Sequence, residues 1–333
     1  MKQKMRLHVL YQAIENPWGG SNTFFRNFIR EAQKDSSIEM TKKPEQADMV
    51  LTAGHYRGPG KFLKTLELRN IRSGRPLWHP WGLWNHKKKT KIVFRVDGLR
   101  KVYAEGTVPA DEVLLRHLSY ADGIIYQSRF SRQCFDAVSA ARQKLVAVIP
   151  NGTNREVFFA TPKPHDFSKG VRLISNGWST NPRKGFKTIA AFSLLRNVTV
   201  QHIGRWPEGI TSEKVELLGV KKENEIGDLL RRAHFFLFPS ENEACPNVVV
   251  EALASGLPIL YHPSGGTAEL AAHNRFGMAL PEDSQIPTLE EFMKNAAAHY
   301  TEMGKNIEAG QEVFDFSNCY RQYREMFEKV LRD

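Results

Sequence analysis

Residues 235–261 read FFLFPSENEACPNVVVEALASGLPILY, and this stretch carries the clearest indication of the fold class. It opens with the apolar run Phe235–Phe238, crosses a polar loop, and enters the apolar helical stretch Val248–Ser255. A second apolar run, Pro258–Tyr261, follows after a short turn that contains glycine. A buried strand, a helix and another buried strand in succession predict a parallel sheet with helices on both faces.

The same alternation extends through both halves of the chain. Each half begins with an apolar run, at Met5 and at Val171, then a loop rich in Gly and Asn, then Phe and Ile at helical spacing. The sequence therefore predicts an α/β protein with two Rossmann-like, doubly wound domains. Further strands are expected at Met49–Thr52, Ile92–Val96, Gly123–Tyr126, Leu145–Ile149 and Val198–Ile203, and helices at Asp111–Tyr120 and Glu223–Ala233.

The domain boundary is expected near residue 160. The stretch 160–169, ATPKPHDFSK, is polar and contains two prolines, as is typical of a linker. We therefore expect an N-terminal domain over residues 1–160, a second domain over 161–315, and an amphipathic closing helix over 316–333.

Positive charge is concentrated in the first half. Residues 1–160 hold 27 Lys and Arg against 14 Asp and Glu, whereas the remainder holds 20 against 22. Within it, residues 57–91 carry ten basic side chains and one acid. Such a field attracts phosphates, anionic lipid or an acidic polymer. A basic surface that serves only solubility is the alternative.

Tryptophans adjoin this basic stretch. Trp78, Trp81 and Trp84 precede Lys87–Lys89, a combination that suits peripheral contact with an anionic membrane. Stacking on sugars or nucleobases is a second interpretation, and a buried loop is a third.

Several classes of protein are excluded. No run of 18 apolar residues is present, and the first apolar run is too short for a secretory signal. Cys134, Cys245 and Cys319 lack metal-like or disulfide-like spacing, which favours a reducing cytoplasm. There is no Asp-any-Asp motif and no cluster of His and Cys, so no metal site is expected.

Candidate site residues lie in the loops that follow strands, where open parallel sheets bind ligands. Glu243 follows the run at 235–238, and Glu251 stands among apolar neighbours on the next helix. Ionised carboxylates accept hydrogen bonds from paired sugar hydroxyls, and a lone acid in a buried helix needs a partner or ligand. Arg183 and Lys184 immediately precede a helix and could hold a diphosphate, or could be a solvated pair.

Glu243 and Glu251 at this spacing resemble the paired-glutamate motif of family 4 retaining glycosyltransferases. Each matching piece is unspecific alone, but the ordered set, from about residue 9 to 275, is specific. The other pieces are Gly19-Gly20, Ala47-Asp48, Gln127-Ser128-Arg129-Phe130-Ser131, Ile149-Pro150-Asn151-Gly152, Lys184-Gly185 and Gly265-Gly266-Thr267-Ala268-Glu269-Leu270.

The resemblance implies GT-B architecture, in which two Rossmann-like domains face each other across a cleft and the second holds the nucleotide-sugar. It implies that Glu251 binds the ribose, that Glu243 contacts the transferred sugar, and that Arg183 and Lys184 neutralise the diphosphate. It also implies retention of configuration, with no metal and no cofactor beyond the donor substrate. Further donor contacts are expected at Gly19, Gly20, Asn247, Gly266 and Thr267.

Two positions depart from the common pattern of that family. Trp178 follows Gly177 where many relatives carry arginine. Asp97 follows a strand where many relatives place a histidine that faces the sugar, and we predict that Asp97 contacts sugar or acceptor. An Asp–Gly turn paired with Arg95 is the alternative. His55 is a weaker candidate.

The leading interpretation is a cytoplasmic enzyme, peripheral on the inner face of a membrane, that transfers a hexose from a UDP- or GDP-linked donor. Its acceptor would be an acidic or membrane-associated glycan or lipid, such as an envelope glycan. The alternatives are a glucosyltransferase that acts on nucleic acid and a GT-B protein that binds a glycan or nucleic acid without turnover.

Overall fold

The computed structural model describes residues 4–15, 19–54, 56–74, 90–99, 101, 108–136, 145–161, 166–211 and 213–333. The chain forms two compact units, Met1–Pro150 with Phe316–Asp333, and Asn151–Asp315. The sequence suggested a division after residue 160, whereas the units divide after Pro150. The difference arises because Asn151 and Val157 bond to the second unit. The Asn151 Nδ2 donates to the Cys245 carbonyl at 2.9 Å, and Arg231 donates to the Val157 carbonyl at 2.8 Å.

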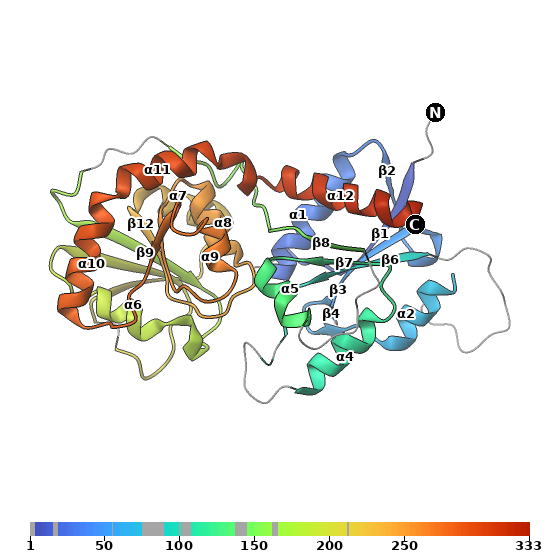
Figure 1. Ribbon diagram of the computed structural model, residues 1–333, viewed down its shortest axis with the longest axis horizontal. Helices are drawn as coiled ribbons and strands as arrows, with labels where there is room; N and C mark the ends of the chain where they lie inside the picture. The colour runs from blue at the N-terminus through green and yellow to red at the C-terminus, as the bar shows by residue number, and fades with distance from the viewer. Residues whose placement is uncertain are drawn as a thin grey trace. The chain divides into compact units, whose positions relative to one another are not determined.

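The first unit is built on a sheet with the strand order β2-β1-β3-β6-β7-β8 (Figure 1). Each neighbouring pair along this path is parallel. A short antiparallel hairpin, β4 (Tyr56–Gly58) and β5 (Lys61–Phe62), extends from β3. The strands of the path are β1 (Met5–Leu10), β2 (Ile38–Met40), β3 (Met49–Ala53), β6 (Lys91–Val96), β7 (Gly123–Tyr126) and β8 (Leu145–Val148).

Helices cover both faces of this sheet, because successive side chains of a strand point to opposite faces. Leu51 and Val93 pack into one apolar core with α1 and α12. Val50 and Ile92 pack into another with α2, α4 and α5. The helices are α1 (Gly20–Lys34), the 3-10 turn η1 (Pro44–Gln46), α2 (Thr65–Arg72), α4 (Val108–Leu118), α5 (Arg129–Asp136) and α12 (Phe316–Arg332).

The last helix, α12, belongs to the first unit although it follows the second in sequence. Aromatic rings hold it there: Phe24 and Phe316 have centroids 5.4 Å apart, and Phe28 and Tyr323 are 5.5 Å apart. All four rings are buried, and each buried aromatic ring contributes roughly 2–3 kcal/mol of apolar transfer free energy.

The second unit contains a sheet with the order β11-β10-β9-β12-β13-β14, in which each pairing is parallel. Figure 1 labels its two middle strands, β9 and β12. Four of these strands, β9, β10, β12 and β13, coincide closely with the predicted apolar runs. The strands are β9 (Val171–Gly177), β10 (Val198–Gly204), β11 (Val215–Gly219), β12 (Phe235–Phe238), β13 (Ile259–Tyr261) and β14 (Gly277–Ala279).

Two apolar cores flank the second sheet as well. Ile174 and Phe236 face a core with α7 and α8, whereas Leu173 and Phe235 face a core with α6, α10 and α11. The helices and turns are η2 (Pro182–Lys184), α6 (Phe186–Phe192), α7 (Glu223–Arg232), α8 (Asn247–Ala254), α9 (Thr267–Leu270), α10 (Ile286–Ala298), α11 (Tyr300–Ala309) and η3 (Gln311–Phe314).

The predicted α/β class with two parallel sheets is therefore confirmed. Within the described residues, every helix is too short or too polar to cross a membrane.

Candidate active site

The order of strands in the second sheet places a topological switch point between β9 and β12. The chain runs from β9 to β10 and β11 on one side, and then from β12 to β13 and β14 on the other. Loops that leave the carboxyl ends of two such strands diverge, and the crevice between them is where doubly wound sheets bind ligands. The loop after β9 carries Arg183 and Lys184, and the loop after β12 carries Glu243.

Lys184 and Glu243 meet at this switch point. The Lys184 ammonium donates to Glu243 Oε1, and the Ser240 hydroxyl donates to the same oxygen at 2.8 Å. Neither side chain is fully buried, so both remain within reach of a ligand. The structure therefore brings together a cation and a carboxylate that the sequence placed 59 positions apart.

The loop that carries Lys184 is fixed on both sides. Asn181 caps the η2 turn, because its Oδ1 accepts from the Arg183 amide at 3.0 Å. Gly185 has a φ of 71°, and a Cβ there would lie 2.6 Å from the Pro239 side chain. The Glu241 amide donates to the Arg183 carbonyl at 2.9 Å, which ties the β9 loop to the β12 loop. Only glycine allows this close approach.

The loop that carries Glu243 is held from the other side by the loop after β13. The Asn242 amide donates to Ser264 Oγ at 2.8 Å. A Cβ on Gly265 would lie 2.6 Å from the Glu243 carbonyl oxygen, so the two backbones are in contact. The Gly266 amide donates to that same carbonyl at 2.7 Å. The Gly266 amide is therefore engaged with the backbone that carries Glu243, and its contact with the donor stays a prediction.

Helix α8 carries Asn247 and Glu251. Glu251 is only 8% exposed, in agreement with its apolar neighbours in the sequence. Asn247 opens the helix, and its Oδ1 accepts from Asn151 Nδ2 at 2.8 Å. Asn151 is buried, and its backbone N–H also donates to Cys245 Sγ at 3.3 Å. Asn151 therefore orients the entry into α8.

Asn151 and Ser240 support the site but were not among the residues predicted for it. Their immediate flanks, Pro150-Asn151-Gly152 and Pro239-Ser240, were the available signal. Thr267 is wholly buried at the start of the four-residue helix α9, and its hydroxyl has no hydrogen-bond partner among the described residues. Its contact with the donor stays a prediction.

The first unit carries a second group of predicted residues, at the carboxyl edge of its own sheet. Asp97 follows β6 and accepts from Arg95 at 2.7 Å, from the Ser21 hydroxyl at 3.1 Å, and from the Gln127 amide. Arg95 is 1% exposed, whereas the Asp97 side chain is 55% exposed. The ion pair between Arg95 and Asp97, given above as the alternative for Asp97, is present. It leaves the Asp97 side chain exposed to solvent.

Gly19 and Gly20 begin α1 beside this group. Gly19 has a φ of 82° and open space where a Cβ would stand. Ser21, in the first turn, links the glycine loop to Asp97. The Arg95 guanidinium, which pairs with Asp97, lies 4.1 Å from the centroid of the Phe24 ring.

The phenol of Tyr11 is also influenced by this group. Burial, together with the nearby charge of Asp97, raises the pKa of Tyr11 to about 12, so this phenol stays protonated at neutral pH.

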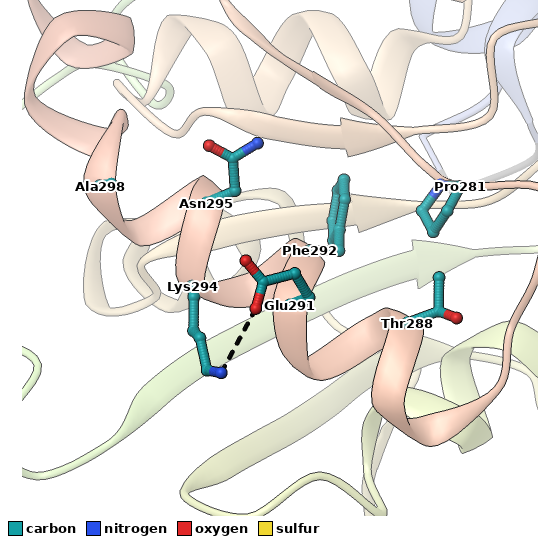
Figure 2. A pocket seen from close by; sticks show the side chains of 7 residues that line it. All are labelled: Pro281, Thr288, Glu291, Phe292, Lys294, Asn295 and Ala298. Atoms are coloured by element: carbon teal, nitrogen blue, oxygen red, sulfur yellow. Dashed lines mark hydrogen bonds and ion pairs between the residues drawn. The ribbon is translucent and has the colours of Figure 1, made fainter.

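A shallow hollow on the second unit lies elsewhere, along α10 (Figure 2). Figure 2 shows Phe292 and Pro281 on one side and the pair Glu291–Lys294, 3.3 Å apart, on the other. Both charges are exposed, so a ligand there would gain no desolvated polar contact. None of the predicted site residues lines this hollow.

Some predicted features lie outside the described residues: His55, the tryptophans of the stretch 77–86, and Lys87–Lys89. In the part of the chain that the structure describes, no three His, Cys, Asp or Glu side chains gather as metal ligands would. Independence from metal stays a prediction.

Part of the chain is similar to proteins of known families. Residues 180–297, which include both Lys184 and Glu243, match the family model described as glycosyl transferases group 1. Over 246 residues, 68% of this chain, the sequence is 23% identical to the phosphatidylinositol N-acetylglucosaminyltransferase gpi3 subunit of Schizosaccharomyces pombe. The match covers 53% of that protein, so the chain spans about half the length of this relative.

Two solved structures superpose along nearly the whole chain. Sucrose-phosphate synthase from Thermosynechococcus elongatus has a TM-score of 0.70 at 16% identity, covering 99% of this chain and 100% of that one. Anabaena HepE in complex with UDP has a TM-score of 0.69 at 16% identity, covering 98% and 100%.

At such identities the likeness establishes the fold: the chain is an α/β protein with the GT-B fold of glycosyltransferases. Within it, residues 180–297 are the part that is similar to the group 1 glycosyltransferases.

Proposed function

We propose that the chain is a retaining, metal-independent glycosyltransferase that moves a hexose from a UDP- or GDP-linked sugar to an acidic or membrane-associated glycan or lipid. The observation that carries this proposal is the pairing of Lys184 with Glu243 at the switch point of the second sheet. Doubly wound sheets bind their ligands in the crevice at this switch point, so the ion pair lies where it can contact a ligand.

The chemistry asks the protein to stabilise a departing nucleoside diphosphate. The acceptor hydroxyl forms its bond to the anomeric carbon as the bond from that carbon to the diphosphate breaks, on the same face of the sugar. The hydroxyl proton passes to the departing phosphate oxygen. Lys184 has three N–H donors and uses one on Glu243, which leaves donors for the charge that develops on the diphosphate.

The two glutamates suit the two sugar rings of the donor. Glu243 is fixed by Ser240 and Lys184, and we assign its second oxygen to a hydroxyl of the transferred hexose. Glu251 is assigned to the ribose, with Asn247 beside it at the start of α8. The complexes of Anabaena HepE with UDP and with UDP-glucose support a nucleotide-sugar donor. Asp97 in the first unit is assigned to a hydroxyl of the acceptor or sugar.

Loss of Glu243 tests the proposal. Purified protein incubated with UDP-glucose, UDP-N-acetylglucosamine or GDP-mannose is expected to release the nucleoside diphosphate from at least one of them. Glu243→Ala should lower that rate by about 100-fold, because it removes a contact to the sugar and frees Lys184 from its position.

The matched control is Glu241→Ala, an exposed acid two positions away in the same loop, which should leave the rate unchanged. If no donor is turned over and none raises the melting temperature, the enzymatic proposal is wrong.

A surface of the first unit fits the membrane-associated acceptor. We define the 61–69 patch as the exposed side chains Lys61, Phe62, Lys64, Leu66 and Arg69 on β5 and the start of α2. Phe62 is 63% exposed and Leu66 is 44% exposed. Apolar side chains flanked by three cations match a bilayer surface with anionic headgroups.

Vesicle binding checks this assignment. The protein should sediment with vesicles that contain phosphatidylglycerol and not with pure phosphatidylcholine, and Phe62→Ser combined with Leu66→Ser should reduce the bound fraction several-fold. Val313→Ser, at an exposed apolar position of the second unit, is the control that should change nothing. Equal binding to both kinds of vesicle would contradict an electrostatic surface.

A further inference from the structure

Arg205 and Trp178 form a stacked pair at the carboxyl edge of the second sheet. The Arg205 guanidinium carbon lies 4.4 Å from the centroid of the Trp178 ring. Trp178 directly follows β9 and Arg205 directly follows β10, and the parallel register pairs Gly204 with Gly177. The register of the two strands therefore places these side chains next to each other. They lie at the edge of the sheet where the site loops begin.

The backbone that presents Arg205 is held from several directions. Its amide donates to the Gly177 carbonyl at 3.1 Å. Gly204 has a φ of 106°, and a Cβ there would stand 2.0 Å from the Gly177 carbonyl oxygen, so only glycine permits this approach. A surface residue that serves only solubility does not require so tightly fixed a backbone.

A buried histidine completes the support. The Arg205 carbonyl can only accept, so His202 Nε2, 3.1 Å away, carries the proton, and Nδ1 accepts from the Ser175 hydroxyl at 2.8 Å. Burial lowers the pKa of His202, so the ring stays neutral in this tautomer. The ring also packs against Phe186, which directly follows the Lys184–Gly185 loop. Phe186 also packs edge-on against Trp206, which directly follows Arg205, with ring centroids 5.1 Å apart. The chain segments after Lys184 and after Arg205 therefore meet in one aromatic cluster.

The charge on Arg205 is not neutralised locally. Its side chain is exposed and forms no ion pair with any residue that the structure describes. Stacking on an indole occupies one face of the guanidinium and leaves the N–H groups in its plane for an anion. Lys184 on the adjoining loop already shares its charge with Glu243. A diphosphate at this edge carries more than one negative charge, so a cation on the neighbouring loop would add to Lys184 and to the Arg183 expected beside it.

We infer that Arg205, held flat on Trp178, binds the diphosphate of the nucleotide donor beside Lys184. The inference rests on the proposed function and adds to it a cation supplied by the strand next to the switch point. Trp178 acts as a positioning residue, because it touches the guanidinium and not the phosphate. A neutral residue at 205 should weaken binding of the phosphates and leave binding of the nucleoside unchanged.

The test uses UDP and GDP as probes, with calorimetry on the full chain at low and at physiological salt. Whichever probe binds the wild type should bind Arg205→Gln about tenfold more weakly, with a shallower dependence on salt. Arg205→Lys should recover part of the loss, and Trp178→Ala should cost about threefold because the cation–π contact is exposed. The corresponding nucleoside, titrated by NMR, should bind wild type and Arg205→Gln alike.

The matched control is Arg196→Gln. Arg196 is exposed and lies two residues before β10, so it stands at the opposite end of the strand that Arg205 follows. Equal affinity of Arg205→Gln and wild type for the diphosphate would overturn the inference while leaving the proposed function intact. An equal loss for the nucleoside would also overturn it, since Arg205 would then contact the base. If the wild type binds neither diphosphate, the proposed function fails as well.

Discussion

Replacing Lys184 with alanine is expected to lower kcat/KM for transfer by about 100- to 1,000-fold. The ammonium stands at the switch point of the second sheet, and the charge it meets grows as the bond to the diphosphate breaks. Removal of an interaction that strengthens in the transition state lowers kcat as well as kcat/KM. Steady-state kinetics with the preferred donor would show this as a fall in both constants.

Two controls separate charge stabilisation from other effects. Lys187→Ala removes an exposed lysine three positions later and should leave both constants unchanged. The double variant Lys184→Ala with Glu243→Gln removes the carboxylate that the single variant leaves unpaired beside the phosphates. If the double variant regained most of the activity, repulsion from Glu243 and not loss of the cation would explain the defect.

Glu251→Gln is expected to weaken binding of the nucleoside diphosphate by about 10- to 100-fold. A carboxylate can accept from two ribose hydroxyls at once, whereas an amide offers one accepting oxygen and two donors. Glutamine has nearly the same shape as glutamate, so the exchange should preserve the packing of this side chain, which is 8% exposed. The effect should therefore fall on binding. Calorimetry would measure the affinity, and thermal unfolding would confirm that the fold is retained.

Glu290→Gln, on the exposed side of α10 in the same unit, provides the comparison for loss of one negative charge. Should Glu251→Gln bind nucleotide as tightly as the wild type, the ribose is held elsewhere and Glu251 serves the structure of α8.

The parts of the fold that could be predicted are those whose residues carry their own signal. Phe235–Phe238 and Gly123–Tyr126 are wholly apolar runs, and both are strands with these limits. The edge strands β2, β11 and β14 were not predicted. Glu39 and Glu216 interrupt two of them, and β14 is the short segment Gly277–Ala279. Pairing with a neighbour, and not local composition, makes them strands.

The site shows the same division. Lys184 could be chosen because it immediately precedes a predicted helix in the loop after a predicted strand, and Glu243 because it follows the apolar run Phe235–Phe238. That they touch depends on β9 lying beside β12, and strand order is not written in any local pattern. Arg205 gave no signal at all, since its position comes from the register between β9 and β10. Asn151 likewise depends on a bond to Asn247 across 96 positions.

The most direct measurement is a crystal structure of the chain with the nucleoside diphosphate bound. We predict that a phosphate oxygen lies about 3 Å from Lys184 Nζ, with a ribose hydroxyl bonded to Glu251. A structure in which the nucleotide binds away from the carboxyl ends of β9 and β12, with Lys184 bonded only to Glu243, would contradict the account.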